Sequence, residues 1–224
     1  MPTFDAEWLL FKVILLPPLL LSLVVHEYAH ARTALAFGDP TAKNMGRLTL
    51  NPLAHLDPIG TLCIFLVGFG WAKPVPVNPM NLQPPRLGDI AVSLAGPASN
   101  LLIAIITAGL LRLWWAVALT DNETVFYAIH SYLLMIASVN IVLCVFNLIP
   151  LFPLDGHHVL REVLPPESQG RFMFWQVRFG SLALMALLFG PNLLSMITRN
   201  PNIPDPLGWV LLHVRTVVLA AMGI

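Results

Sequence analysis

The chain has 224 residues, of which 57% are hydrophobic and only 11% are charged, and its formal net charge is zero. Because soluble globular domains carry about 25% charged residues, this composition excludes an ordinary soluble domain and indicates a multi-pass membrane protein. The zero net charge gives no reason to expect nucleic acid as a partner.

The first apolar stretch predicts a long helix from about Glu7 to Phe37, which is the roughly 20 residues needed to cross hydrocarbon plus an extension. Pro17 and Pro18 lie within it and must kink or divide it, because proline lacks the amide hydrogen that a helix interior uses. The motif His-Glu-Tyr-Ala-His occupies residues 26–30, and Gly-Asp-Pro at residues 38–40 ends the helix.

A polar part with the strand-like run Arg47–Asn51 comes next. The apolar segment over residues 59–70 has only about 12 residues, too few to cross as a helix, so we interpret it as a short re-entrant or partial segment. Alternating prolines in residues 70–79 exclude a helix and allow at best an edge strand. We therefore expect small extended or β elements here.

Two further full spans are predicted, over residues 89–119 and 124–148. The first contains Ala-Gly-Pro-Ala-Ser-Asn at residues 95–100, and the second runs into Asn-Leu-Ile-Pro-Leu-Phe-Pro-Leu-Asp-Gly at residues 147–156. The two prolines of that sequence break the helix and free backbone groups, which then need partners from protein or water.

Two more apolar stretches, residues 171–197 and 207–222, are separated by a turn-rich connection. We find no internal repeat, so a single membrane domain covers residues 1–224. We divide it into a core over about residues 9–160, which holds the motifs described below, and C-terminal helices over about residues 171–222. The predicted fold is an all-α polytopic membrane protein with about five full transmembrane helices and one partial segment.

The basic residues of the loops suggest an orientation, because loops rich in Lys and Arg tend to stay cytoplasmic. Such residues follow the first and third spans, and the loop between the second and third spans has none. We therefore expect the N-terminus outside and the C-terminus inside, in the plasma membrane. This orientation places the end of the first span and the end of the third span on the cytoplasmic side.

The spacing of His26 and His30 indicates a metal site. On a helix, residues i and i+4 project from one face, so the two imidazoles can share a metal ion. Glu27 lies about 100° round the helix from His26, where it can reach a water molecule beside the metal without being a ligand. An ionisable trio at membrane depth is costly and is usually functional. The alternative is a pair of structural histidines bonded to backbone or to neighbouring helices.

A catalytic zinc ion needs a third protein ligand and one open position. The Gly and His that extend this motif in many soluble metalloproteases are absent, because Thr33 and Ala36 occupy their positions. Asp155 is the best-placed candidate, since it lies at a proline-broken end of a span on the same side, and Gly156 permits close backbone approach. Its alternative role is to start the helix that follows.

The motif at residues 26–30, the sequence at 147–156 and the Gly-Pro-x-x-Asn element at 96–100 together resemble the site-2 protease family of intramembrane zinc metalloproteases. The resemblance implies one zinc ion per chain, held by His26, His30 and Asp155. It implies Glu27 as the general base of peptide hydrolysis. The implied substrates are transmembrane segments of other proteins, cut within or near the lipid bilayer.

Two other functions compete with this one. A catalytically inactive scaffold of the same family would bind membrane segments without cutting them. A metal transporter would need polar residues along several spans, whereas here they cluster at one depth. The sequence gives no indication of the oligomeric state.

Four residues are candidates for contact with substrate. Asn147 would donate a hydrogen bond to the developing oxyanion without titrating, or bond to backbone freed by the prolines. Asn100 would bind substrate or order the packing between spans. A helix conceals its peptide bonds, so a substrate must unwind, and it could then pair with an extended edge. Trp71 and Val75 lie in such a segment, whose alternative is an ordinary packed loop.

Overall fold

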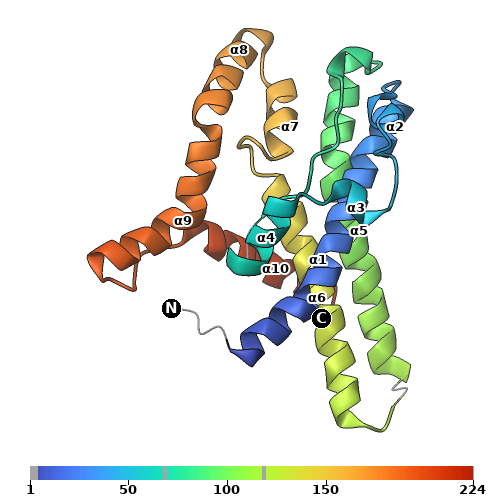
Figure 1. Ribbon diagram of the computed structural model, residues 1–224, viewed down its shortest axis with the longest axis vertical. Helices are drawn as coiled ribbons and strands as arrows, with labels where there is room; N and C mark the ends of the chain where they lie inside the picture. Colours follow the sequence, from blue (N-terminus) through green and yellow to red (C-terminus); the bar gives the residue numbers. More distant parts are fainter. Residues whose placement is uncertain (1–4, 68–69, 118–119, 224) are drawn as a thin grey trace.

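The computed structural model describes residues 5–67, 70–117 and 120–223, and within these ranges it contains helices and no strand. Four helical segments there are long and apolar enough to cross a membrane: Ala6–Ala36, Pro85–Val117, Glu123–Asn147 and Pro166–Thr198. The predicted all-α, multi-pass membrane architecture is confirmed (Figure 1).

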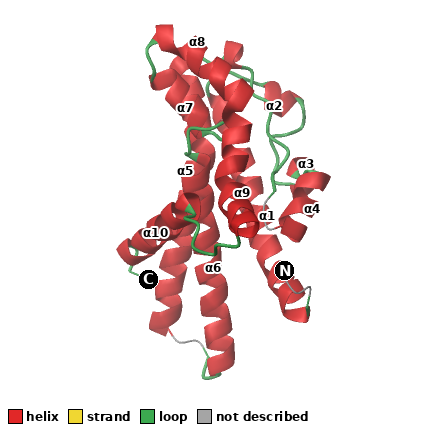
Figure 2. Cartoon of the chain, turned by 90° about the vertical axis from the view of Figure 1, so that its left-hand side faces the viewer, coloured by secondary structure: helices red, strands yellow, loops and turns green. Residues whose placement is uncertain are grey.

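Three helices form the centre of the molecule: α1 (Ala6–Ala36), α5 (Pro85–Val117) and α6 (Glu123–Asn147). Helix α5 packs against both of the others, and α5 and α6 run side by side as a long pair (Figure 2). Small side chains let these two helices approach closely. The buried residues of this contact, together with one from α10, are Ala104, Ala137, Ile141 and Leu219.

Helix α1 remains one continuous helix through Pro17 and Pro18, so the prolines do not divide it. The hydroxyl of Ser22 donates a hydrogen bond to the carbonyl of Pro18 at 2.7 Å. Gly38 follows the end of the helix with a φ of 95°, a left-handed conformation that glycine adopts without a steric cost.

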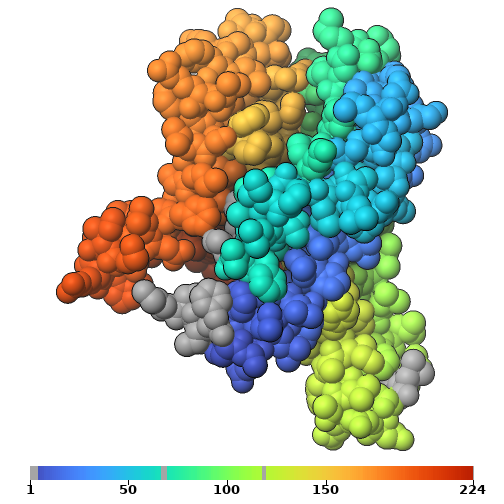
Figure 3. All heavy atoms as spheres, in the orientation of Figure 1, coloured from blue at the N-terminus to red at the C-terminus, as the bar shows by residue number. Residues whose placement is uncertain are grey.

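Three short helices separate α1 from α5: α2 (Thr41–Asn44), α3 (Pro52–His55) and α4 (Pro58–Val67). With 10 residues, α4 is about 15 Å long, half the hydrocarbon thickness of ~30 Å. It corresponds to the predicted partial segment 59–70, of which residues 68–69 lie outside the described part. The rings of Trp8 and Phe65 join α4 to the start of α1, with centroids 5.4 Å apart, and Figure 3 shows α4 in front of α1.

An extended segment, residues 70–78, follows α4 and is called the strap here. It leads into the short 3₁₀ helix η1 (Pro79–Asn81). An isolated antiparallel bridge between Leu56 and Ala72 is the β-type pairing in the described part of the strap. The expected extended element is therefore present, but it does not form a strand.

The strand-like run Arg47–Asn51 also forms no strand. The side chain of Asn51 accepts a hydrogen bond from the amide of Leu53 and so starts α3. Arg47 directs its guanidinium to the strap, where Nη2 donates to the carbonyl of Lys73 at 2.6 Å. Capping and this side-chain contact decide the local structure, and the sequence pattern did not reveal either of them.

The C-terminal part begins with α7 (Gly156–Val163), after which α8 (Pro166–Trp175), η2 (Gln176–Gly180) and α9 (Ser181–Thr198) follow one another without a break. The predicted span 171–197 is thus the larger part of one longer helical segment. The last helix, α10 (Pro206–Ala221), has 16 residues and is about 24 Å long, which is shorter than the full span predicted there.

Candidate metal centre and active site

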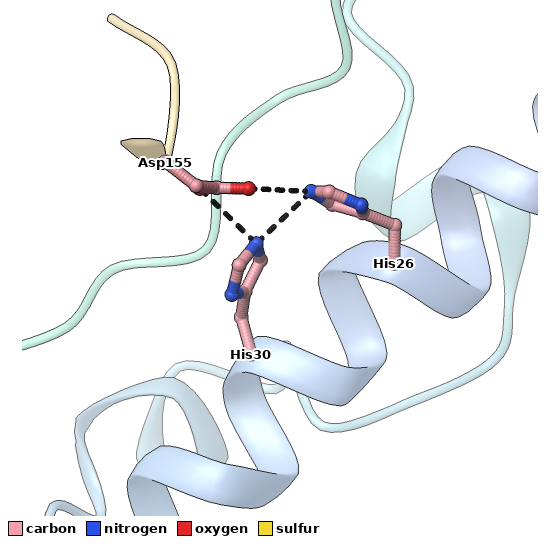
Figure 4. Close-up of side chains that lie close together, drawn as sticks. All are labelled: His26, His30 and Asp155. Atoms are coloured by element: carbon pink, nitrogen blue, oxygen red, sulfur yellow. Dashed lines mark hydrogen bonds and ion pairs between the residues drawn. The ribbon is translucent and has the colours of Figure 1, made fainter. Parts of the chain in front are cut away.

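His26 and His30 lie one turn apart on α1, and their rings converge on the carboxylate of Asp155 (Figure 4). Nε2 of His26 is 3.2 Å from Oδ2 of Asp155, and Nε2 of His30 is 3.4 Å from Oδ1. The two Nε2 atoms are 3.0 Å apart. The three residues come from opposite ends of the core sequence, and their ligand atoms all lie within 4.8 Å of one another.

Helix α5 determines which nitrogen of each ring carries the proton. Nδ1 of His30 is 2.7 Å from the carbonyl oxygen of Val92, which only accepts, so this nitrogen donates. Nδ1 of His26 is 2.7 Å from Oδ1 of Asn100 and donates likewise. In neutral rings, both Nε2 atoms therefore present lone pairs to the shared centre, as metal-binding histidines do.

This arrangement fits a cation. In these neutral tautomers, two lone pairs face each other and a carboxylate, and neither Nε2 has a hydrogen to donate. Oδ2 of Asp155 is buried and has no hydrogen-bond partner among the described residues. Two imidazole nitrogens and one carboxylate, with the fourth position open, form one of the donor sets of catalytic zinc.

Asp155 occupies the N-cap position of α7, but its side chain does not play the alternative role of capping that helix, because it makes no capping hydrogen bond to it. Gly156 allows the close approach that the sequence suggested, because a Cβ there would clash with the carbonyl oxygen of Leu148. The loop can thus fold back and direct Asp155 toward α1.

Glu27 is buried beside the histidines, with 9% of its surface exposed, and is not part of the ligand group. Its Oε2 accepts a hydrogen bond of 2.8 Å from the amide of Val75 in the strap. The glutamate and the three candidate ligands line one cavity of about 530 Å³. Glu27 is therefore positioned for proton transfer in that cavity.

The remaining predicted residues divide into two groups. Trp71, Val75 and Asn147 line the cavity. Asn147 donates from Nδ2 to the carbonyl of Leu143 in its own helix at 2.9 Å, so it does not use the backbone freed by the prolines. Asn100 is fully buried and is not among the cavity-lining residues; it lies behind His26 instead of facing a substrate.

Two buried contributors to the site were not predicted from the sequence. Asn140 of α6 is fully buried and bonds to Asn100. Gln176 of η2 bonds to the loop that carries Asp155. The only sequence signal for either was a polar amide in an apolar helix, a feature that deserves a functional hypothesis in a membrane protein.

An ion pair holds α7 against α5. Nη2 of Arg161 lies 2.7 Å from Oδ2 of Asp89, and Nδ1 of His158 lies 3.6 Å from the same oxygen. Because α7 begins directly after Asp155, this pair fixes the direction in which the chain leaves the candidate ligand.

A long-helix membrane protein with this donor set and an adjacent glutamate has the site of a metalloprotease. The comparisons agree. Residues 113–189 match the family model "Peptidase family M50". The chain is 40% identical to "Putative zinc metalloprotease YwhC" of Bacillus subtilis over 189 residues, which cover 83% of this chain and 86% of that protein.

Other relatives are the similarly named Rip2 of Mycolicibacterium smegmatis, 36% identical over 78% of this chain and 66% of that protein, and "Zinc metalloprotease MJ0392" of Methanocaldococcus jannaschii, 28% identical over 84% and 45%. No solved structure matches the chain. The chain belongs to peptidase family M50, the site-2 protease family.

Proposed function

We propose that this protein is an intramembrane zinc metalloprotease that hydrolyses peptide bonds within or near the transmembrane segments of other membrane proteins. One observation carries the proposal: Asp155, in the loop after α6, meets His26 and His30 on a helix long enough to cross a bilayer, and Glu27 lines the same cavity. In this proposal they hold one zinc ion per chain, with Glu27 as the general base.

The position of the site along α1 supports cleavage close to the membrane surface. His30 precedes the last residue of the helix, Ala36, by 6 positions, or about 9 Å. Basic residues follow that end of the helix, which favours the cytoplasmic side of the plasma membrane. The substrate would reach the site from the bilayer and the water from the cytoplasm.

When bound, zinc would polarise the substrate carbonyl and favour ionisation of the attacking water. The other roles in the reaction belong to groups of the protein itself. The amide of Val75 holds Oε2 of Glu27 and leaves Oε1 to accept the proton of the water. Glu27 then passes that proton to the leaving amine. Asn147 has a second amide hydrogen, besides the one bonded to Leu143, to offer the oxyanion.

The position of the strap along the cavity supports a role for this segment in substrate binding. Trp71 and Val75 line the cavity from the strap, so an unwound substrate segment would pass between them and the histidines. Pro74 and Pro76 have no amide hydrogen, so at these two positions a paired substrate strand could only donate to strap carbonyls. The partners proposed here are transmembrane proteins within the lipid bilayer.

The test combines zinc analysis with cleavage of a transmembrane substrate by purified protein in bilayer discs. We expect Glu27→Gln to retain about one zinc per chain and to lose cleavage, because the change removes the base and not a ligand. Asp155→Ala should lose both. Cleavage by Glu27→Gln at the wild-type rate would overturn the mechanism. An inactive scaffold would bind substrate without cutting it. A transporter, reconstituted in sealed vesicles instead of discs, would move zinc across the membrane.

A further inference from the structure

A line of buried polar side chains runs from α6 to the back of His26. Asn140 bonds to the hydroxyl of Ser22 and to Asn100, and Asn100 bonds to the imidazole of His26. Both asparagines are fully buried, and the exposed fractions of Ser22 and His26 are 3% and 4%. Three helices contribute, and of the line only His26 is among the residues that line the cavity.

Hydrogen-bond chemistry orients the first part of the line. The hydroxyl of Ser22 donates its single hydrogen to the carbonyl of Pro18, which can only accept. Oγ of Ser22 therefore accepts from Nδ2 of Asn140 at 2.9 Å, and the same Nδ2 also donates to the carbonyl of Ile136 at 2.9 Å. With both hydrogens of its amide used in this way, Asn140 must turn Oδ1 toward Asn100.

The orientation of the Asn140 amide determines that of the Asn100 amide, which in turn determines the tautomer of His26. Nδ2 of Asn100 donates to Oδ1 of Asn140 at 3.0 Å, and it also faces the carbonyl of Ser22 at 3.4 Å. Oδ1 of Asn100 then faces Nδ1 of His26 at 2.7 Å, and an oxygen without a hydrogen requires the proton on that nitrogen. Nε2 of His26 is left with its lone pair directed at His30 and Asp155.

The two histidines differ in this respect. A backbone carbonyl sets the tautomer of His30 in a single step, and that oxygen cannot exchange places with a donor. The tautomer of His26 depends on an amide group, which presents an oxygen or a nitrogen according to its rotation. If Asn100 turned its Nδ2 to the ring, the ring proton would move to Nε2, where it would block a metal.

We propose that Asn140 and Ser22 are positioning residues for the metal: they fix the rotation of the Asn100 amide and thereby keep Nε2 of His26 free to bind. The inference rests on the proposed function, because it assumes a metal on His26. It assigns a role to α6, which supplies no candidate ligand of its own, and it explains why an amide lies at the middle of an apolar helix.

The experiment measures the zinc affinity of purified full-length variants by competition with a chelator. Asn140→Leu should weaken zinc binding about 10- to 100-fold, the usual range for residues that orient a metal ligand. Ser22→Ala should weaken it several-fold, since Asn140 keeps its bond to Ile136. Ser138→Ala is the matched control, because the hydroxyl of Ser138 bonds to the carbonyl four residues before it on α6, as that of Ser22 does on α1, and this bond is not part of the line.

Two further variants, Asn140→Asp and Ser22→Thr, distinguish a positioning role of these side chains from a packing role. Asp at position 140 keeps an oxygen that accepts from Asn100, so Asn140→Asp should bind zinc more tightly than Asn140→Leu. A packing role predicts the reverse order, because the buried carboxylate destabilises the helix bundle more than leucine does. Ser22→Thr, which keeps the hydroxyl, should restore the affinity lost in Ser22→Ala.

Histidine ¹⁵N chemical shifts of the zinc-free protein provide a readout of the tautomer itself. Wild type should show His26 protonated on Nδ1, and Asn140→Leu should show a mixture. Wild-type affinity and an unchanged tautomer in Asn140→Leu would overturn the inference, as would equal zinc loss in Ser138→Ala. Absence of zinc binding by the wild-type protein would instead overturn the proposed function, so the two failures are distinguishable.

Discussion

A Cβ atom on Gly96 of α5 would lie 2.5 Å from Nε2 of His26 and closer still to Nε2 of His30. No side chain fits there without displacing both rings. The glycine lets α5 approach α1 so closely that Val92 and Asn100 reach the backs of the two imidazoles. The Gly-Pro-x-x-Asn element thus has two roles in the site. Its glycine leaves room for the Nε2 atoms of both rings, and its asparagine bonds to Nδ1 of His26.

Gly96→Ala should therefore lower zinc affinity about 10- to 100-fold, because both nitrogen donors must move. Gly109→Ala is the matched control on the same helix, since a Cβ at Gly109 meets nothing within 4 Å. Alanine is favoured over glycine in a helix by about 1 kcal/mol, so the control should be neutral or slightly stabilising. Chelator competition measures both variants, and wild-type affinity in Gly96→Ala would contradict this account of the site.

Gln176 ties the fourth apolar segment to the loop before Asp155. Its Oε1 accepts from the amide of Phe152 and its Nε2 donates to the carbonyl of Pro150, both at 2.8 Å. The π-helical turn η2 presents this side chain, which is 1% exposed. A single amide thus pairs with two backbone groups that the proline-broken loop leaves without helical partners.

Gln176→Leu should lower the free energy of unfolding by about 1–3 kcal/mol, because two buried backbone groups lose their partners. Zinc affinity should fall as well, since Asp155 loses the support of its loop. Gln169→Leu removes one hydrogen bond of the same amide type from α8, where the partner is the carbonyl of Leu164 and not the ligand loop, and should leave zinc affinity unchanged. Unfolding in mild denaturant and chelator competition give the two quantities, and a stability loss without any change in zinc affinity would show that the loop holds Asp155 unaided.

Arg47 anchors the strap by donating from Nη2 to the carbonyls of Lys73 and Pro74 at 2.6 and 3.3 Å. Lysine cannot reproduce this forked contact, because its ammonium is a single flexible point charge. Arg47→Lys should reduce substrate cleavage about 10-fold while zinc affinity stays at the wild-type value. Arg86→Lys, an exposed arginine at the start of α5, is the control. Full cleavage by Arg47→Lys would show that the strap needs no such anchor.

Asp39 holds the other end of the strap, where its Oδ2 accepts from the amide of Asn78 at 2.8 Å. Burial alone would raise the pKa of Asp39, but hydrogen bonds from Thr41, Asn81 and Asn78 outweigh it and hold the pKa below its ordinary value of 3.8. A lowered pKa in the folded state means that folding favours the ionised carboxylate. Its stabilising contribution is complete above the unfolded value and is lost as the pH falls through the folded value.

Asp39→Asn should therefore lower the melting temperature by a constant amount between about pH 5 and 8. The difference from wild type should shrink as the pH falls below about 4, because the unfolded state becomes protonated there while the folded state stays ionised down to its lower pKa. Melting curves across this range check the prediction. Asp121→Asn, an exposed change in the loop before α6, should show no such trend. A wild-type advantage that persists at the lowest pH would show that the carboxylate charge is not the stabilising feature.

Several parts of this protein followed from the sequence alone. Apolar run lengths predicted the long helices, because a bilayer requires about 20 apolar residues in a row. The i, i+4 spacing predicted that His26 and His30 share a face, since helix geometry is local. Asp155 was identifiable because prolines and a glycine mark its loop and because its motif resembles that of a known family.

Only the tertiary structure determined which residues surround the candidate ligands and contact them. Asn140, Gln176 and Gly96 act on the ligands through contacts between segments that are 24 to 118 residues apart in the chain. No local pattern carries such information, because the packing of α5 against both α1 and α6 creates the contacts. The sequence determined which residues could bind a metal, and the packing of three helices decided which nitrogen of each histidine is left free to do so.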